Sequence, residues 1–215
     1  MRTVFSLSLL LLGGILFGQK EAAAEAYLDK VARDLDPGHA LKIAFDYIRE
    51  DLQSEAVLEG SGTLVLMGEK YKMDLDEAVI WFDGEKQYSL NTDIEEVYVS
   101  EPDPENKEFI FTDPIRLLQN YKETFKYRLM GEGEMDGTPV TEIQLYPEEL
   151  GGPYALIKIY FATGSSALQS IVVRHKEGIV YTMKVAETER MEDPGAAFFR
   201  FSSEAYPYVD VIDLL

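Results

Sequence analysis

The sequence predicts a mainly β protein of the α+β class: a meander of about 10 to 11 antiparallel strands, curled into an open or half-closed β-barrel, with one helix in front and one in the middle. Most of the chain after residue 40 alternates apolar and polar residues with the period of two that half-buried strands require. Turn signals such as Asp83-Gly84 separate these runs by a few residues, which favours a meander. Helical periodicity is confined to two segments.

The first 19 residues have the three-part pattern of a secretory signal peptide. Arg2 precedes an apolar run from Val4 to Phe17, and the small residue Gly18 leads to the polar Gln19. The run is shorter than the roughly 20 residues that a membrane-spanning helix needs. We therefore expect residues 1–19 to be a cleavable signal peptide, residues 20–215 to form a single domain, and the mature protein to be exported. The alternative is an uncleaved membrane anchor.

The elements of the domain follow from periodicity and breakers. An amphipathic helix is expected over Glu21–Leu35, where Asp36-Pro37-Gly38 ends it, and a short second helix begins at Asp113-Pro114. The expected strands cover 41–48, 57–67, 70–76, three short strands within 79–99, then 125–131, 138–146, 154–161, 168–175 and 180–188, and a last strand or extended tail at 196–201. Short connections between most of these strands predict antiparallel neighbours.

Composition limits the possible functions. The 46% hydrophobic and 12% aromatic fractions allow a packed core in this chain of 215 residues. The formal charge of -19 repels nucleic acid and anionic bilayers, so no nucleic-acid partner is expected. Without cysteine, the chain has no disulfide, thiolate metal site or acylated cysteine.

The sequence offers little equipment for catalysis. His39 and His175 are isolated, and no ligand-spaced cluster surrounds either of them. Gly60-Ser61-Gly62 lies within a strand pattern and lacks the spacing of a nucleophile elbow, so its glycines more plausibly permit a bend in the sheet. We predict a non-enzymatic protein without catalytic residues, metal or cofactor. A hydrolase that uses two of the many carboxylates stays open as an alternative.

Apolar side chains are the most informative feature. On alternation, many of them can face one side of a sheet: Leu41, Ile43, Phe45, Tyr47, Leu64, Leu66, Tyr71, Met73, Leu75, Val79, Trp81, Tyr88 and Leu90. One interpretation is an ordinary core that packs against the two helices. The other is an apolar cavity between helices and sheet, because curled meanders of this size commonly enclose a ligand.

Several stretches resemble the LolA family of periplasmic carriers of outer-membrane lipoproteins. The similarity begins at the helix EAYLDKVARDL and the strand HALKIAFDYI, continues through GSGTL, and is clearest in FDGEKQYSLNTDIEEV. In the family a strand ends in Asp-Gly, an aromatic residue opens the next strand, and an Asn and a Glu follow. Here these residues are Asp83, Gly84, Tyr88, Asn91 and Glu95. The later stretches TDPIRLLQ, TEIQLYP and FFRFSSE match more loosely.

The resemblance implies an unclosed, curled antiparallel β-barrel with helices forming a lid over its concave face. It also implies a carrier or chaperone in the periplasm, whose apolar interior shelters the acyl chains of lipoproteins between the inner and outer membranes. We predict that the acyl chains contact Phe45, Leu66, Met73, Leu75, Trp81, Tyr88 and Leu90, and that the lid contains Leu28, Val31, Leu117 and Leu118. The implied partners are acylated lipoproteins as cargo and, through transient contacts, an inner-membrane releasing complex and an outer-membrane acceptor. We expect a monomer.

One feature departs from the family. Members typically carry a basic residue followed by proline after the strand that begins at the G-x-G, and this residue helps to hold the lid closed. Here the segment reads LVLMGEKYKM, without arginine, and Lys70 is the candidate substitute. The alternative function is a binding module of the same architecture for a free lipid, another apolar ligand such as a pigment intermediate, or a stress signal.

Overall fold

The computed structural model describes residues 10–34, 39–101, 117, 121–149 and 151–215. A long helix, α1 (Leu10–Asp34), precedes the strands. The strands are β1 (Ala40–Asp51), β2 (Ala56–Met67), β3 (Lys70–Leu75), β4 (Ala78–Phe82), β5 (Gln87–Asn91), β6 (Glu96–Ser100), β7 (Phe125–Met135), β8 (Thr138–Pro147), β9 (Tyr154–Ala162), β10 (Leu168–His175), β11 (Ile179–Met191) and β12 (Asp210–Asp213). A 3-10 turn, η1 (Ala196–Phe199), lies between β11 and β12.

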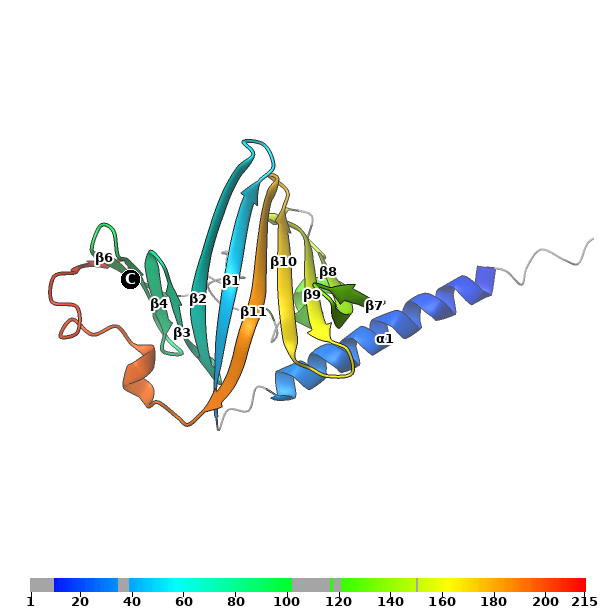
Figure 1. Ribbon diagram of the computed structural model, residues 1–215, viewed down its shortest axis with the longest axis horizontal. Coiled ribbons are helices and arrows are strands. Elements are labelled where there is room, and N and C mark those ends of the chain that lie inside the picture. The colour runs from blue at the N-terminus through cyan, green and yellow to red at the C-terminus, as the bar shows by residue number, and fades with distance from the viewer. Residues whose placement is uncertain (1–9, 35–38, 102–116, 118–120, 150) are drawn as a thin grey trace, which may run out of the picture.

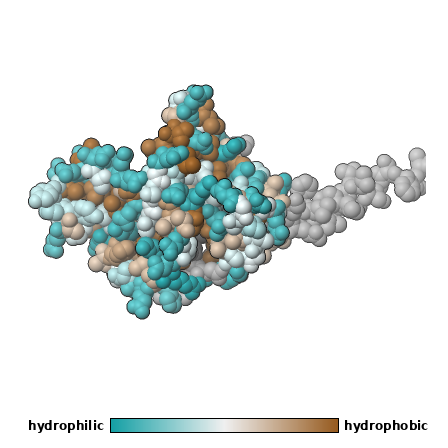
Figure 2. Space-filling view, in the orientation of Figure 1, coloured by the Kyte–Doolittle hydropathy of each residue, from teal (hydrophilic) through white to brown (hydrophobic). Residues whose placement is uncertain are grey.

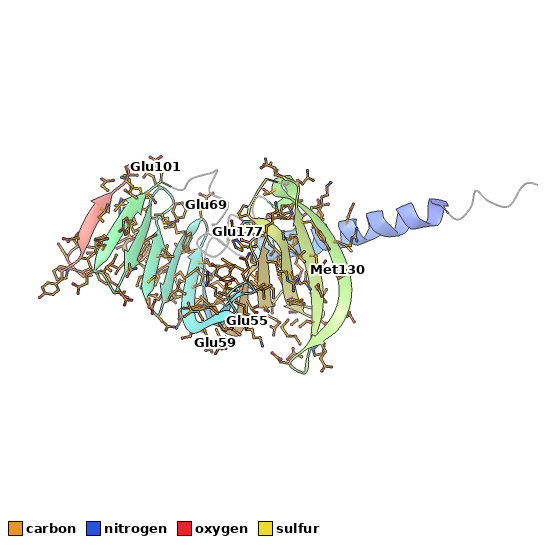
Figure 3. The ribbon with its side chains drawn as sticks, turned by 90° about the horizontal axis from the view of Figure 1, so that it is seen from above. Glu55, Glu59, Glu69, Glu101, Met130 and Glu177 are labelled. Carbon is orange, nitrogen blue, oxygen red and sulfur yellow. The ribbon has the colours of Figure 1, made fainter. Side chains whose placement is uncertain are left out.

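All of these strands belong to one sheet that does not close. Its order is β12-β6-β5-β4-β3-β2-β1-β11-β10-β9-β8-β7. Two meanders, β2–β6 and β7–β11, are joined at β1, which pairs antiparallel with both β2 and β11. The sheet is curled, as the views from the front and from above show (Figures 1 and 3). The predicted fold class, a mainly β, unclosed and curled antiparallel sheet with a helix on one face, is confirmed.

The element boundaries differ from prediction near both ends of the chain. The described residues form twelve strands, one more than the upper number predicted. The additional strand, β12, pairs with β6 in parallel, with Asp210 opposite Glu96 and Asp213 opposite Val99. Its sequence DVID has too little apolar alternation to signal a strand. Residues 196–199, expected to be extended, form η1.

Of the two helices expected from the sequence, the structure describes the first and only a few residues of the second. The first helix starts before Glu21, at Leu10. Among the helices of the described residues, none is long and apolar enough to cross a membrane. The predicted second helix lies largely outside the described residues, although Leu117 and residues 121–124 are helical.

The sheet has two differently covered faces. We call the face that contacts α1 the inner face and the opposite one the outer face. Figure 1 shows α1 lying against the half of the sheet that contains β7–β10. On the outer face, the chain from η1 to β12 packs against β4, β5 and β6, where Phe201, Tyr206 and Val209 contact the strands. The sheet therefore has apolar cores on both faces.

Candidate functional site

The inner face is apolar over β1–β4 and over β7–β11. One cluster, over β7–β10, contains Ala24, Leu28, Val31, Leu117, Tyr121, Phe125, Ile143, Leu145, Tyr154, Ile157, Ile159, Phe161 and Val173. The second, over β1–β4 and β11, contains Ile43, Phe45, Leu64, Leu66, Tyr71, Met73, Ile80, Phe82 and Met183. Leu168 and Ile171 on β10 pack against both clusters, so the apolar surface is continuous from one meander to the other. The second cluster contains no residue of α1.

Four of the seven predicted acyl-chain contacts lie together on the inner face. Phe45, Leu66 and Met73 are buried members of the second cluster, and Leu75 is half-buried and packs against it. They come from β1, β2 and β3, whose alternation places every second residue on this side. The structure thus brings these four side chains into one surface.

The other three predicted contacts are on the outer face, so the prediction that all seven share a face is wrong. Trp81, Tyr88 and Leu90 belong to a cluster with Val79, Val97 and Val99, which the C-terminal segment covers. The ring of Trp81 lies 5.8 Å from that of Phe201 and 5.6 Å from that of Tyr206, both edge-on.

The cause of this error is the short turn between β3 and β4. Tyr71 pairs with Phe82 and Met73 with Ile80, so odd-numbered residues of β3 face the same side as even-numbered residues of β4. A count that carried the odd-numbered pattern of β3 through the turn therefore placed Trp81 on the wrong side.

The residues that carry the family resemblance build turns and fasten the C-terminal segment. Oδ1 of Asp83 accepts the backbone N–H groups of Glu85 (3.0 Å) and Lys86 (2.8 Å), and Gly84 has a φ of 98°. The other oxygen of Asp83 forms an ion pair with Arg200 Nε at 3.1 Å, and the same Nε donates to the Tyr88 hydroxyl at 3.0 Å. These contacts indicate a structural role for Asp83.

Asn91 and Glu95, the last two residues of the family pattern, form the turn between β5 and β6. Oδ1 of Asn91 accepts the N–H groups of Asp93 (3.0 Å) and Ile94 (3.3 Å). Glu95 has a φ of 54°, and its carbonyl accepts the N–H of Asp210 at 2.9 Å. The motif therefore connects the β5–β6 turn to β12.

The two glycines of the GSG stretch make room for aromatic rings on the inner face. Gly60 pairs with Tyr47 and Gly62 with Phe45 across the β1–β2 ladder. A Cβ at Gly62 would lie 2.6 Å from Phe45 Cζ and 2.9 Å from the Asp74 carbonyl oxygen. The rings therefore lie over the glycines, so the stretch shapes the apolar wall.

Three of the four predicted lid residues pack on the inner face. Leu28 and Val31 of α1 and Leu117 belong to the cluster over β7–β10. Leu118 lies outside the described residues. Tyr27 of α1 adds a hydroxyl that donates to the Ser165 carbonyl, and Lys30 Nζ lies 3.0 Å from Ser166 Oγ.

A polar cluster joins α1 to the helical turn at 121–124. Lys122 Nζ lies 2.9 Å from both Glu25 Oε1 and Asp29 Oδ1, and the Tyr121 hydroxyl donates to Asp29 Oδ1 at 2.8 Å. We call these four residues the latch. Hydrogen bonds from Lys122 and Tyr121 lower the pKa of Asp29, while burial and the bond to Asp29 raise the pKa of Tyr121.

Lys70, the candidate substitute named from the sequence, is not a member of the latch. Lys70 alternates with the inner-facing Tyr71 and lies on the outer face, opposite Met67. The latch was missed because its members are 92 to 97 residues apart in the chain, and only the fold brings them together.

A second group missed from the sequence lies at the inner-face end near the β1–β2 turn. Arg49 pairs with Leu58 on one side and Tyr181 on the other. Its Nε donates to the Tyr181 hydroxyl at 3.4 Å, with the guanidinium carbon 5.9 Å from the ring centre. The row continues with His175, whose ring centre lies 5.4 Å from that of Tyr181 and 5.0 Å from that of Tyr154. The apolar face therefore ends in a polar and aromatic row.

These features define a class of protein: an open, curled antiparallel sheet with an apolar inner face and a helix packed against part of it. No protein-family model and no curated protein sequence matches the chain. An uncharacterised conserved protein from Thermus thermophilus has a similar structure, with a TM-score of 0.60 at 12% identity, over 89% of this chain and 99% of that one. That similarity shows a common fold.

Two further solved structures match with lower scores. A putative outer membrane lipoprotein-sorting protein domain from Vibrio parahaemolyticus has a TM-score of 0.46 at 10% identity, over 80% of this chain and 94% of that one. A LolA superfamily protein from Nitrosomonas europaea has a TM-score of 0.46 at 9% identity, over 83% of this chain and 97% of that one.

Proposed function

We propose that this protein is a periplasmic carrier that binds the acyl chains of lipoproteins against its inner face and moves them from the inner to the outer membrane. The observation that supports the proposal best is the continuous apolar inner face, where Leu168 and Ile171 link the clusters of the two meanders. The sequence resemblance to the LolA family supports the same function. Residues 1–19 would direct export.

The chemistry of acyl chains matches such a face. Burying a chain releases about 0.8 kcal/mol per CH₂, so an acylated protein needs an apolar surface to cross water. Of the seven residues predicted from the sequence, Phe45, Leu66, Met73 and Leu75 remain the proposed contacts. Trp81, Tyr88 and Leu90 lie under the C-terminal segment and are not part of the proposed site.

Transfer by such a carrier requires no catalytic group. It requires a cover that opens and an acceptor that binds the cargo more tightly than the carrier does. The helix α1, with Leu28 and Val31 against β7–β10, is the proposed cover. Its latch is partly exposed, with Lys122 45% accessible, and ion pairs of this kind contribute little free energy. Opening of α1 would therefore meet little resistance from the latch.

Release of lipoproteins from membranes tests the proposed function. Inner-membrane vesicles that carry acylated lipoproteins are incubated with the mature protein, and the supernatant is analysed after sedimentation. We expect lipoprotein to appear there in a complex with the protein. Equal release without the protein would contradict the carrier function.

A pair of variants links the release to the inner face. Leu75→Glu places a carboxylate on the half-buried inner surface and should reduce release about tenfold or more, because a charge packed against an apolar cluster is costly. Leu214→Glu, at a residue 62% exposed, should leave release unchanged. Mass spectrometry of protein purified from membranes distinguishes the alternative: free lipid without lipoprotein would indicate a lipid-binding module.

A further inference from the structure

The polar and aromatic row contains a charged side chain that the proposed function does not yet use. Arg49 is half-buried on the inner face of β1, two residues beyond Tyr47, which packs against the second apolar cluster. Tyr181, its neighbour on β11, packs against the first cluster. Arg49 therefore lies where the margins of both apolar clusters meet.

Within the described part of the chain, Arg49 forms no ion pair, and its side chain donates only to the Tyr181 hydroxyl. The acidic residue that follows it on the same side of β1 is Asp51. Oδ1 of Asp51 accepts the N–H groups of Gln53 (2.9 Å) and Ser54 (3.3 Å) in the β1–β2 turn. Hydrogen bonds from Ser54 and Gln53 and the nearby charge of Arg49 lower the pKa of Asp51, but the two side chains form no ion pair. An arginine keeps its charge under all ordinary conditions, and a partly buried charge is favourable only when it is paired.

We propose that Arg49 binds the anionic head group of an amphiphile whose acyl chains lie on the inner face, so that the ligand class is anionic rather than neutral lipid. This inference rests on the acyl-chain site of the proposed function and concerns an anionic lipid bound at that site. The planar guanidinium presents several N–H donors, which suit a carboxylate or a phosphate. Tyr181 holds the guanidinium at the end of the apolar surface, while Phe45 and Met73 lie farther along it.

The position of Arg49 also limits where the head group lies. The β1–β2 turn reaches the top of the molecule in Figure 1, and three exposed apolar residues, Leu52, Val57 and Leu58, surround this end. Figure 2 shows apolar side chains gathered on this projecting tip. A ligand with its head group at Arg49 would have its polar end toward solvent and its chains toward β3 and β4.

Two ligands with the same chain and different head groups test this inference. cis-Parinaric acid, ionised at pH 8, and the corresponding alcohol become fluorescent on binding an apolar site, and their dissociation constants can be compared directly. The wild-type protein should bind the acid about tenfold more tightly, as expected for one charge-assisted hydrogen-bonded pair at a partly exposed site. Arg49→Gln should abolish this preference by weakening binding of the acid alone. Arg49→Lys should restore part of it.

Arg190→Gln is the matched control. Arg190 is also on the inner face, opposite Leu41, about 27 Å from Arg49 along β1 at the usual rise per residue. This variant should keep the preference for the acid. Displacement of the fluorescent ligand by lysophosphatidylglycerol and by monoacylglycerol extends the comparison to a phosphate head group. We expect the anionic lipid to displace the ligand at the lower concentration.

The outcomes separate the two proposals. Equal affinity of the wild type for acid and alcohol, or an equal loss for both ligands in Arg49→Gln, would overturn the role of Arg49 and leave the apolar site standing. Binding of neither ligand would overturn the proposed function and this inference with it.

Discussion

Individual side chains of this protein have roles that follow from which face of the sheet they occupy. Gly62 is an example, since its lack of a Cβ lets the Phe45 ring lie across the β1–β2 ladder. Asp83 is another, because one carboxylate oxygen caps a turn while the other holds Arg200. Both residues belong to stretches that the sequence resemblance singled out: Gly62 shapes the inner face, and Asp83 fastens the C-terminal segment that covers the outer face.

The Gly62→Ala variant tests the packing at this position. The added Cβ would lie 2.6 Å from Phe45, 2.8 Å from Leu75 and 2.9 Å from a backbone oxygen, which cannot move freely. We expect the free energy of unfolding, measured by chemical denaturation, to fall by about 1 to 3 kcal/mol, the usual cost of overpacking. Gly133→Ala, where a Cβ meets no atom within 4 Å, should change it by less than about 0.5 kcal/mol. Equal effects of the two substitutions would contradict the packing described here.

At the scale of elements, α1 is held to the sheet by two kinds of contact. Its apolar residues Leu28 and Val31 enter the cluster over β7–β10, and its polar residues Glu25 and Asp29 form the latch with Lys122. The apolar contacts supply most of the binding free energy, because partly exposed ion pairs are weak. The latch chiefly fixes where α1 sits on the sheet.

The latch predicts a dependence on pH. The pKa of Asp29 is lowered from 3.8, first by its bond to Lys122, so its contribution to stability is present above pH 3.8 and is lost as the pH falls through the lowered value. Asp29→Asn should therefore destabilise the protein at neutral pH, and the difference from wild type should shrink below pH 3.8. Denaturation midpoints across this range measure the effect.

The control for this series is Asp93→Asn, the same substitution at an exposed turn residue. It should show no such convergence with the wild type. A difference between wild type and Asp29→Asn that stays constant down to the lowest pH would contradict the role of Asp29 in the latch.

The sequence was sufficient for the order of strands from β1 to β11, but not for η1, β12 or all side-chain orientations. Alternation within β1, β2 and β3 correctly grouped Phe45, Leu66, Met73 and Leu75, because a strand keeps its period of two. It failed for Trp81 and for the strand that follows, since the turn at residues 76–77 decides which residues of β4 face inward. The latch and the row at Arg49 depend on contacts between distant segments, which periodicity does not reveal.

The whole molecule combines an apolar inner face with a second core on the outer face. The chain from η1 to β12 covers Trp81, Tyr88 and Leu90, so these large side chains stabilise the sheet from outside. This arrangement leaves the inner face of β1–β4 as the surface proposed for acyl chains. The central claim is therefore that acyl chains bind on one defined side of the sheet.

Adjacent aromatic residues on β4 allow a direct test of that claim. Trp81 faces the outer cluster, and Phe82 faces the inner one next to Tyr71, with ring centres 5.5 Å apart. The double variant Trp81→Phe/Phe82→Trp moves the single tryptophan to the inner face and keeps the composition of the strand. A bromine-bearing acyl chain, which quenches tryptophan fluorescence on contact, should quench the double variant strongly and the wild type weakly. Strong quenching of Trp81 in the wild type, or no quenching at position 82 while the ligand is bound, would contradict the account.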